Sequence, residues 1–414
     1  MKTTTLYLLA TLAAAVSAQD QYTATGTAAV AAAAATALTT SPTSKVSGKA
    51  FDRIAFIWLE NTDYSLAVED PNLKYIASQG ILLSGSYGQT HPSEPNYIAS
   101  ASGETFGMDN DNFNQIPANV STVIDLLEAG NISWGEYQED SPYSGFEGIA
   151  WVNQKTKAND YVRKHNPAVS YNSVADSTQR LSQTKNFTLF NEDLANNKLP
   201  QWMFITPNMT DDGHDTSVTV AGTWLRGFLE PLLTNKNFMD NTLVVITFDE
   251  TETYTIPNNV MTILIGDAVP KSLVGTKDTN FYNHYSQLST VEANWGLHTL
   301  GRWDVGANVY QMVAEKTGDV VRKLATPNPA NSSYPGLFNS ENTDVPFPVP
   351  NTALVMNGRT VLPSIVETWG NYQNESYYTT SVQTPDGSHP PVYPTPKKKH
   401  HHRDAESYAV LYEA

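Results

Sequence analysis

Residues 54–61 read Ile-Ala-Phe-Ile-Trp-Leu-Glu-Asn, an apolar run that ends abruptly in a carboxylate and an amide. Such a short run, rich in β-branched and aromatic residues, is typical of a strand buried on both faces, as in a parallel sheet. Similar runs occur at Ile81–Leu83, Trp202–Ile205, Leu243–Ile246 and Val260–Ile265. Apolar residues at helical spacing lie between them, for example at Ala221, Trp224, Leu225, Phe228, Leu229 and Leu232. This alternation predicts an α/β fold with a doubly wound, mostly parallel sheet flanked by helices.

Polar side chains follow three of these runs at the point where each one ends. They are Glu60 and Asn61 after the first run, Asp212 and His214 after the Trp202–Ile205 run, and Asp249 and Glu250 after the Leu243–Ile246 run. Ligands bind at the carboxyl ends of the strands in such a sheet, so we expect these side chains to meet. Each could instead cap a helix, but neighbouring carboxylates repel one another and usually signal a bound cation. Oxygen ligands with one or two imidazoles suit Zn, Mn, Mg or Ca, and the residue types do not select among them.

A hydroxyl group stands at the start of another predicted helix. The segment Thr90–Tyr97 leads into a helical stretch that runs to about Ser102 and ends at Gly103. Pro95 fits the first helical turn, which places Ser93 or Glu94 near the N-cap. A hydroxyl there faces the backbone N–H donors that a phosphoryl group needs, although it could also do no more than cap the helix.

The charge balance and the lack of cysteine exclude several classes of protein. The chain of 414 residues carries 25 Lys and Arg against 42 Asp and Glu, a net charge of −17. Nucleic acids and anionic membranes both attract clustered cations, so this balance argues against either as a partner. Without cysteine there are no thiolate zinc sites, cysteine nucleophiles or disulfides.

The first 18 residues have the features of a signal peptide. Lys2 precedes the mostly apolar stretch Leu6–Val16, and small residues at the end of that stretch form a cleavage site. A membrane anchor is the alternative, but the stretch is shorter than the ~20 residues of a span. We therefore expect a secreted protein without a stable membrane anchor. Glycosylation sequons fit this location and stand at Asn119, Asn131, Asn186, Asn208, Asn331 and Asn374.

Composition divides the rest of the chain. Residues 19–49 are mostly Ala, Thr and Ser, and we expect a linker that buries too little apolar surface to fold. Residues 50–325 form the expected catalytic domain. Residues 326–389 form a C-terminal extension, in which Asn357-Gly358 predicts a hairpin turn. The basic, histidine-containing tail at 390–414 is expected to be flexible.

Four motifs together resemble one family. They are HPSEPNYIASASGETFG (His91–Gly107), PNMTDDGHDTSV (Pro207–Val218), VVITFDE (Val244–Glu250) and NHYSQLSTVEANWGL (Asn283–Leu297). The chain resembles, in order from about Arg53 to Asp304, the phosphoesterase family of secreted fungal acid phosphatases and phosphatidylcholine-type phospholipases C. That family belongs to the alkaline-phosphatase-like superfamily. The resemblance implies a metal-assisted hydrolase of phosphate esters that forms a covalent phosphoryl-enzyme intermediate.

The resemblance also implies roles for individual residues. Ser93 takes the position of the nucleophile, and His214 or His284 would protonate the leaving group. The expected metal ligands are Glu60, Asn61, Asp212, Asp249 and Glu250, and the expected phosphate ligands are Asn61 and Asn96. His91 is a weaker candidate for the site, and His165 and His298 are interpreted as structural or surface residues. The family's superfamily more often has Asp-His or Asp-Asp where this chain has Asp249-Glu250, and histidines are few, which argues against a two-zinc centre.

These observations predict a secreted acid phosphatase that acts on small phosphate esters with a divalent metal ion. A phospholipase C-type phosphodiesterase is the alternative enzyme, but the chain lacks the basic or amphipathic patch that suits attack on lipid. A secreted glycoprotein that kept the fold and lost catalysis is the alternative of another class. An acidic working pH is expected from the resemblance and the acidic composition.

Overall fold

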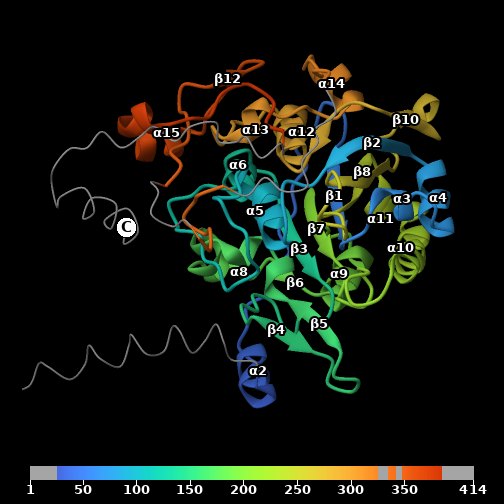
Figure 1. The fold of residues 1–414 in the computed structure, drawn as a ribbon. Helices are drawn as coiled ribbons and strands as arrows, with labels where there is room; N and C mark the ends of the chain where they lie inside the picture. The colour runs from blue at the N-terminus through green and yellow to red at the C-terminus, as the bar shows by residue number, and fades with distance from the viewer. Residues whose placement is uncertain (1–25, 325–333, 342–346, 385–414) are drawn as a thin grey trace, which may run out of the picture.

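The computed structural model describes residues 26–324, 334–341 and 347–384 (Figure 1). The predicted signal peptide, the predicted C-terminal tail and the sequon at Asn331 lie outside the described residues. Among the residues described, no helix is both long and apolar enough to cross a membrane.

The centre of the molecule is a nine-stranded sheet in the order β10-β2-β9-β8-β1-β7-β3-β6, with β11 paired to β2. Its strands are β1 (Arg53–Leu59), β2 (Ile81–Tyr87), β3 (Trp134–Gln138), β6 (Thr184–Lys185), β7 (Trp202–Thr206), β8 (Thr242–Phe248), β9 (Asn259–Ile265), β10 (Thr276–Asp278) and β11 (Tyr282–Asn283). All neighbours pair in parallel except β9, which is antiparallel to both β2 and β8. The predicted α/β fold with a mostly parallel sheet is confirmed, and β9 makes the sheet mixed.

Helices cover both faces of the sheet (Figure 1). The α-helices are α2 (Thr27–Ala34), α3 (Tyr64–Ala67), α4 (Pro71–Ser78), α5 (Glu94–Ser102), α6 (Val123–Ala129), α7 (Asn172–Ala175), α8 (Thr178–Leu181), α9 (Phe187–Ala195), α10 (Val218–Leu233), α11 (Lys236–Met239), α12 (Tyr285–Trp295), α13 (Trp303–Gly306), α14 (Gln311–Thr317) and α15 (Pro363–Trp369). The 3₁₀ helices are η1 (Arg163–His165), η2 (Ala168–Ser170), η3 (Lys271–Leu273) and η4 (Gly370–Glu375). Two hairpins, β4 (Ala150–Val152) with β5 (Asn159–Val162) and β12 (Val355–Met356) with β13 (Arg359–Thr360), stand apart from the sheet, and the second confirms the predicted turn.

Alternate side chains of β1 point to opposite faces of the sheet and pack into two separate hydrophobic cores. Phe56 and Trp58 point to the face covered by α5, α6 and α12, whereas Ile57 and Leu59 point to the face covered by α4, α9 and α10. All of these side chains are buried, and each full burial stabilises the fold by about 1.5–3 kcal/mol. Burial on both faces explains why the central strands are continuous apolar runs.

The strand register brings the predicted polar residues to one edge. Leu59 pairs with Phe248 between β1 and β8, so Glu60 and Asp249 emerge at the same level. On the other side of β1, the strand β7 runs parallel in the same direction and leads into the segment with Asp212. Three strand ends therefore meet as the sequence predicts.

The interpretation of residues 19–49 as a linker is wrong for the described residues 26–49. Val30 of α2 is buried against Phe146 and Tyr161 next to the β4–β5 hairpin (Figure 1). Further along, Ser44 Oγ donates a hydrogen bond of 2.6 Å to Gln201 Oε1, which also accepts one from the backbone of Val46. Polar side chains of the domain form hydrogen bonds with the polar groups of this segment, so its low apolar content does not prevent it from packing.

The described part of residues 326–389 belongs to the main core and is not a separate extension. Phe347, Ile365 and Trp369 pack in the same cluster as Phe56 and Trp58. This correction arises because the apolar residues of the segment are scattered among Pro and Asn, and no periodic pattern shows which face they bury.

Candidate active site

Glu60 and Asp249 lie side by side at the carboxyl edge of the sheet, and both are fully buried. Asp249 Oδ1 accepts a hydrogen bond of 3.0 Å from the backbone N–H of Asn61. Burial raises the pKa of Glu60 well above its ordinary value, and the charges of Asp249 and Asp212 raise it further. Two carboxyl groups in this position hold a proton between them or share a cation.

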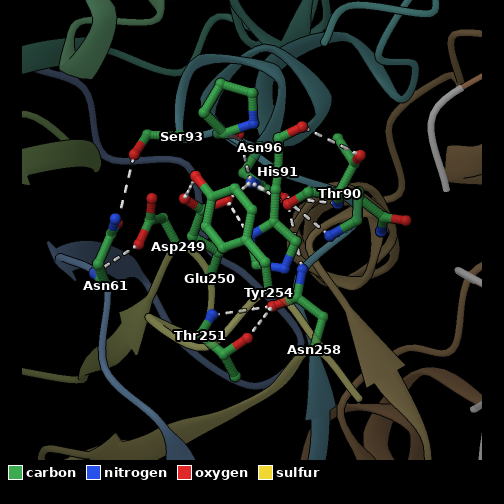
Figure 2. A network of polar contacts seen from close by, with 12 residues as sticks. Asn61, Thr90, His91, Ser93, Asn96, Asp249, Glu250, Thr251, Tyr254 and Asn258 are labelled. Carbon is green, nitrogen blue, oxygen red and sulfur yellow. Dashed lines mark hydrogen bonds and ion pairs between the residues drawn. The ribbon is translucent and has the colours of Figure 1, made fainter. Parts of the chain in front are cut away.

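Ser93 points into this edge from the start of α5. Its Oγ donates a hydrogen bond of 3.1 Å to Glu60 Oε2. The same Oγ lies 3.3 Å from the side-chain amide of Asn61 (Figure 2). With its nitrogen turned toward the carboxylates, the Asn61 amide donates to Glu60 Oε2 at 3.0 Å and to Asp249 Oδ2 at 3.3 Å. Among the described residues the Ser93 hydroxyl makes no capping hydrogen bond to α5. The hydroxyl therefore serves the site and not the helix end.

Glu60, His165 and Asp212 form a cluster that could hold a metal ion. One ligand atom from each lies within 4.8 Å of the others, and all three side chains are buried. The His165 ring nitrogens stand 3.3 Å from Glu60 Oε1 and 3.5 Å from Asp212 Oδ2. His165 Nε2 and Asp212 Oδ2 are buried without a hydrogen-bond partner among the described residues. Buried nitrogen and oxygen atoms without a hydrogen-bond partner are suitable ligands for a divalent cation.

The ionisation of this cluster is set by burial. Burial raises the pKa of Asp212 and of Asp249 above their ordinary values. Burial, followed by the charge of Lys164, lowers the pKa of His165 well below its ordinary range. A neutral imidazole is the form that binds metal, and a cation would replace the protons that the carboxyl groups otherwise retain.

His165 is the site residue that sequence reasoning missed. It lies at the end of η1, which follows the short β4–β5 hairpin, so no long apolar run precedes it. The signal that could have found it is a histidine between Lys164 and the Asn166-Pro167 turn, a weak pattern by itself. Tyr97 is a second missed residue, because its hydroxyl donates a short hydrogen bond to Glu60 Oε1 from inside α5.

His214 lies at the rim of the site. Its side chain is 28% exposed, and Nδ1 lies 2.8 Å from Asp215 Oδ1, so Nδ1 carries the proton and Nε2 faces Lys164 Nζ at 3.4 Å. The backbone N–H of His214 donates to Asp212 Oδ1 at 2.8 Å. The structure thus places His214 next to Asp212 at the rim of the site, with Nε2 beside Lys164.

Glu250 faces away from the Glu60–His165–Asp212 cluster. Its Oε2 lies 2.9 Å from His91 Nδ1 and accepts a hydrogen bond of 3.3 Å from Asn96 Nδ2, while the His91 ring stacks on Tyr254 at 3.9 Å (Figure 2). Burial raises the pKa of Glu250 well above its ordinary value, and the charge of Asp249 adds to the rise. The predicted metal ligand is therefore a partner of His91.

Asn96 and His284 lie behind the site. Asn96 Oδ1 accepts from the backbone N–H of Gln89 at 2.7 Å, and its Nδ2 donates to the carbonyl oxygen of Thr90 at 2.9 Å, which fixes the loop before Ser93. The His284 ring is buried, packs on Trp58 at 4.4 Å, and burial lowers its pKa to about 4. Neither side chain is directed at Ser93.

Comparison with known proteins places the chain in a family. Residues 67–298 match the Phosphoesterase family. This chain belongs to the Phosphoesterase family. An acid phosphatase of Aspergillus fumigatus is 53% identical over 345 residues, which are 82% of this chain and 77% of that protein. A phosphate-repressible acid phosphatase of Penicillium chrysogenum is 54% identical over 313 residues, 75% of this chain and 76% of that protein.

More distant proteins are also similar to this phosphoesterase. A phosphatidylinositol-3-phosphatase of Mycobacterium tuberculosis is 31% identical over 235 residues, 56% of this chain and 71% of that protein. A solved structure from Vibrio parahaemolyticus, of a protein in the alkaline phosphatase superfamily, covers 64% of this chain and 72% of its own, with 13% identity and a TM-score of 0.40. The predicted family, and the predicted enzyme class of phosphate-ester hydrolases, are confirmed by the curated relatives.

The sequons of the phosphoesterase differ in their surroundings. Asn131 is exposed and follows α6, whereas Asn119 and Asn186 are half-buried. Asn374 lies within η4. Asn208 is 8% exposed, and its Nδ2, the atom that would carry a glycan, donates to Asp140 Oδ2 at 2.8 Å.

Proposed function

We propose that this phosphoesterase hydrolyses phosphate monoesters through a phosphoserine intermediate on Ser93. The observation that carries the proposal is the Ser93 hydroxyl, which is buried at the first turn of α5 and donates to Glu60 Oε2 at 3.1 Å. A buried serine that meets a carboxylate at a strand end has the surroundings of an activated nucleophile. The acid phosphatases at about 50% identity support a monoester substrate.

The proposed metal ligands are Glu60, Asp212 and His165, with Asp249 adjacent. A divalent cation bound there would supply Lewis-acid stabilisation to the phosphoryl oxygens and favour the ionised form of the serine. The residues themselves keep the carboxyl oxygens and the imidazole nitrogen converged in a buried position. Glu250, whose carboxylate is paired with His91, is left out of the proposed set.

In the first step the Ser93 Oγ–P bond forms and the bond from phosphorus to the ester oxygen breaks. Glu60 Oε2 already accepts the Ser93 hydrogen bond and receives its proton. His214 keeps its Nδ1 proton on Asp215, so it acts as the acid with a second proton on Nε2, which passes to the ester oxygen as the alcohol leaves. Water then attacks the phosphoserine and gives a proton to Nε2 of His214, the Oγ–P bond breaks, and Ser93 recovers the proton that Glu60 holds.

The remaining predicted residues have positioning roles in this proposal. Asn61 contacts Ser93, Glu60 and Asp249 and orients the nucleophile. Asn96 holds the loop that carries Ser93. His284 supports the backbone of Asp249 and does not contact the leaving group.

The test compares p-nitrophenyl phosphate with bis(p-nitrophenyl) phosphate for the protein and for Ser93→Ala. The matched control is Ser100→Ala, because Ser100 is a buried serine of the same helix whose hydroxyl bonds only to the backbone of Tyr97 among the described contacts. Monoester turnover that Ser93→Ala abolishes and Ser100→Ala keeps is the expected result. Turnover of the diester alone would replace the proposal with a phosphodiesterase, and no turnover would favour a fold retained without catalysis.

We also propose secretion, glycosylation and an acidic working pH. The apolar stretch Leu6–Val16 before small residues supports export, and Asn131 offers an exposed amide for a glycan. N-terminal sequencing of protein from culture medium tests cleavage after Ala18. A pH–rate profile that peaks above about pH 8, beyond the usual range of histidine acid catalysis, would exclude the acidic working range.

A further inference from the structure

One partly exposed cation stands among the buried carboxylates of the site. The Lys164 side chain is 16% exposed, whereas Glu60, Asp212 and Asp249 beneath it are fully buried. Its neighbour Arg163 turns away, since the guanidinium donates to the carbonyl oxygens of Asn114 and Val169. Of the two long cationic side chains of η1, Lys164 is thus the one that faces the site.

Two contacts fix the ammonium group at the mouth of the site. Lys164 Nζ lies 2.9 Å from Asp111 Oδ2, and Asp111 Oδ1 accepts the backbone N–H of Glu94 at 2.9 Å. Asp111 therefore connects Lys164 to the residue next to Ser93. On the other side Nζ lies 3.4 Å from His214 Nε2. The ammonium group stands between the start of α5 and the proposed proton donor.

The charge of Lys164 acts on carboxyl groups from three strand ends. Burial raises the pKa of Glu60, Asp212 and Glu250, and the positive charge of Lys164 opposes the rise at each. These residues follow β1, β7 and β8.

We propose that Lys164 binds the second negative charge of a phosphate monoester and so makes the site select monoesters over diesters. This inference rests on the proposed function and deepens it. A monoester dianion offers three non-bridging oxygens, whereas a diester monoanion has an ester group in place of one of them. Lysine has three N–H donors, and two of them meet Asp111 and His214 among the described residues, which leaves the third for an oxygen of the substrate.

A purely structural role accounts poorly for this arrangement. The Lys164–Asp111 pair is partly exposed, with Asp111 at 27%, and ion pairs of that kind contribute little to stability. The same Asp111 carboxylate also holds the backbone at the start of α5, so it sets the ammonium position relative to Ser93. The ion pair therefore holds the Lys164 ammonium group in a position to contact a substrate.

The test is Lys164→Met, with Lys164→Arg as the charge-retaining variant and Lys74→Met as the matched control. Lys74 is an exposed lysine of α4 that is also paired with a carboxylate, at 2.8 Å from Glu69. We expect Lys164→Met to lower kcat/KM for p-nitrophenyl phosphate by about 10- to 100-fold, with methyl p-nitrophenyl phosphate changed by less than about 3-fold. Inhibition by orthophosphate should weaken by a similar factor. Lys164→Arg should retain most of the kcat/KM for p-nitrophenyl phosphate and most of the inhibition by orthophosphate. Lys74→Met should change neither quantity.

Equal losses for the two esters, or an unchanged inhibition constant for orthophosphate, would overturn the assignment. A melting curve checks the fold of each variant, and Lys164→Gln is measured in the same way if the Met variant does not fold. Ser93→Ala distinguishes a failure of the proposed function from a failure of the proposed role of Lys164. Turnover that survives Ser93→Ala would contradict the proposed function itself. If Ser93→Ala abolishes turnover but Lys164→Met lowers kcat/KM equally for the monoester and the diester, only the proposed role of Lys164 is contradicted.

Discussion

His284 Nε2 donates a hydrogen bond of 2.6 Å to the backbone carbonyl oxygen of Asp249. The other ring nitrogen lies 3.5 Å from Gln287 Nε2, and the ring packs on Trp58, so both nitrogens and one face are occupied inside the fold. The start of α12 thereby fixes the backbone between Asp249 and Glu250. His284, which the family resemblance places in the reaction, thus contacts the backbone of a carboxylate residue.

We predict that His284→Ala slows the hydrolysis of aryl and alkyl monoesters by the same factor, about 10- to 100-fold, because it displaces Asp249 and takes no part in proton transfer. The measurement compares kcat/KM for p-nitrophenyl phosphate and glycerol phosphate. His298→Ala is the control, since His298 bonds to Thr360 at a distance from the site. A loss confined to the alkyl ester would return His284 to the role of proton donor.

His214→Ala should separate the same two substrates. An alkoxide needs a proton in the transition state far more than p-nitrophenolate does, so glycerol phosphate should lose about 10²- to 10⁴-fold and p-nitrophenyl phosphate much less. Asp215→Asn should give a smaller effect of the same pattern, because Asp215 holds the Nδ1 proton of His214. Equal losses for the two substrates would contradict proton donation by His214.

Removal of divalent metal should abolish turnover and lower the melting temperature at neutral pH. Without a cation, Glu60 and Asp212 would have to take up protons or remain as uncompensated buried charges beside the neutral His165. Metal analysis of the purified protein, and melting curves with and without chelator, test this expectation. His165→Ala should lose the metal and the chelator response, while His298→Ala should keep both. An active, metal-free protein would leave the cluster as a proton-sharing site.

The sequence predicts the sheet and its active edge because both depend on short-range patterns. Continuous apolar runs identify β1, β7 and β8, and parallel pairing then brings the residues after each strand together. Ser93 is predictable in the same way, from Pro95 in the first turn of α5 and Gly103 after its end.

What the sequence does not predict depends on long-range packing. His165 reaches Glu60 from a 3₁₀ turn after a small hairpin, and its neighbours do not show which strand end it will face. His91 likewise meets Glu250 only because the loop before α5 crosses the end of β8. Residues 26–49 pack through single hydrogen bonds to side chains such as Gln201, which leave no periodic signal in composition.

Tyr378→Phe should destabilise the protein by about 1–2 kcal/mol without changing the substrate preference. Glu104 is buried next to α5, and it accepts hydrogen bonds from Tyr378 at 2.7 Å and Tyr377 at 3.1 Å as well as one from Tyr334. These hydroxyls attach the C-terminal segment to the core. Urea unfolding measures the effect, with the more exposed Tyr75→Phe as control. An unchanged midpoint for Tyr378→Phe would show that apolar packing alone holds the segment.

Buried carboxyl groups should also set how stability depends on pH. Burial raises the pKa of Glu136 from 4.5 to about 8, in a β3 position where the backbone N–H of Ala168 donates to it at 3.2 Å. Between these two values the folded protein keeps a proton that the unfolded chain releases, so stability falls as pH rises from about 4.5 to about 8.

Glu136→Gln should remove this dependence, because the amide is neutral at every pH and keeps an oxygen for Ala168. We expect the variant and the parent to unfold alike near pH 4, and the variant to be more stable near pH 8 by on the order of 4 kcal/mol. Glu192→Gln on the exposed side of α9 is the matched control and should show no such divergence. Parallel curves for Glu136→Gln and the parent would mean that Glu136 is ionised in the folded protein and compensated by its surroundings. Divergence toward high pH would show that a carboxyl group outside the proposed catalytic set makes the folded protein less stable as the pH rises.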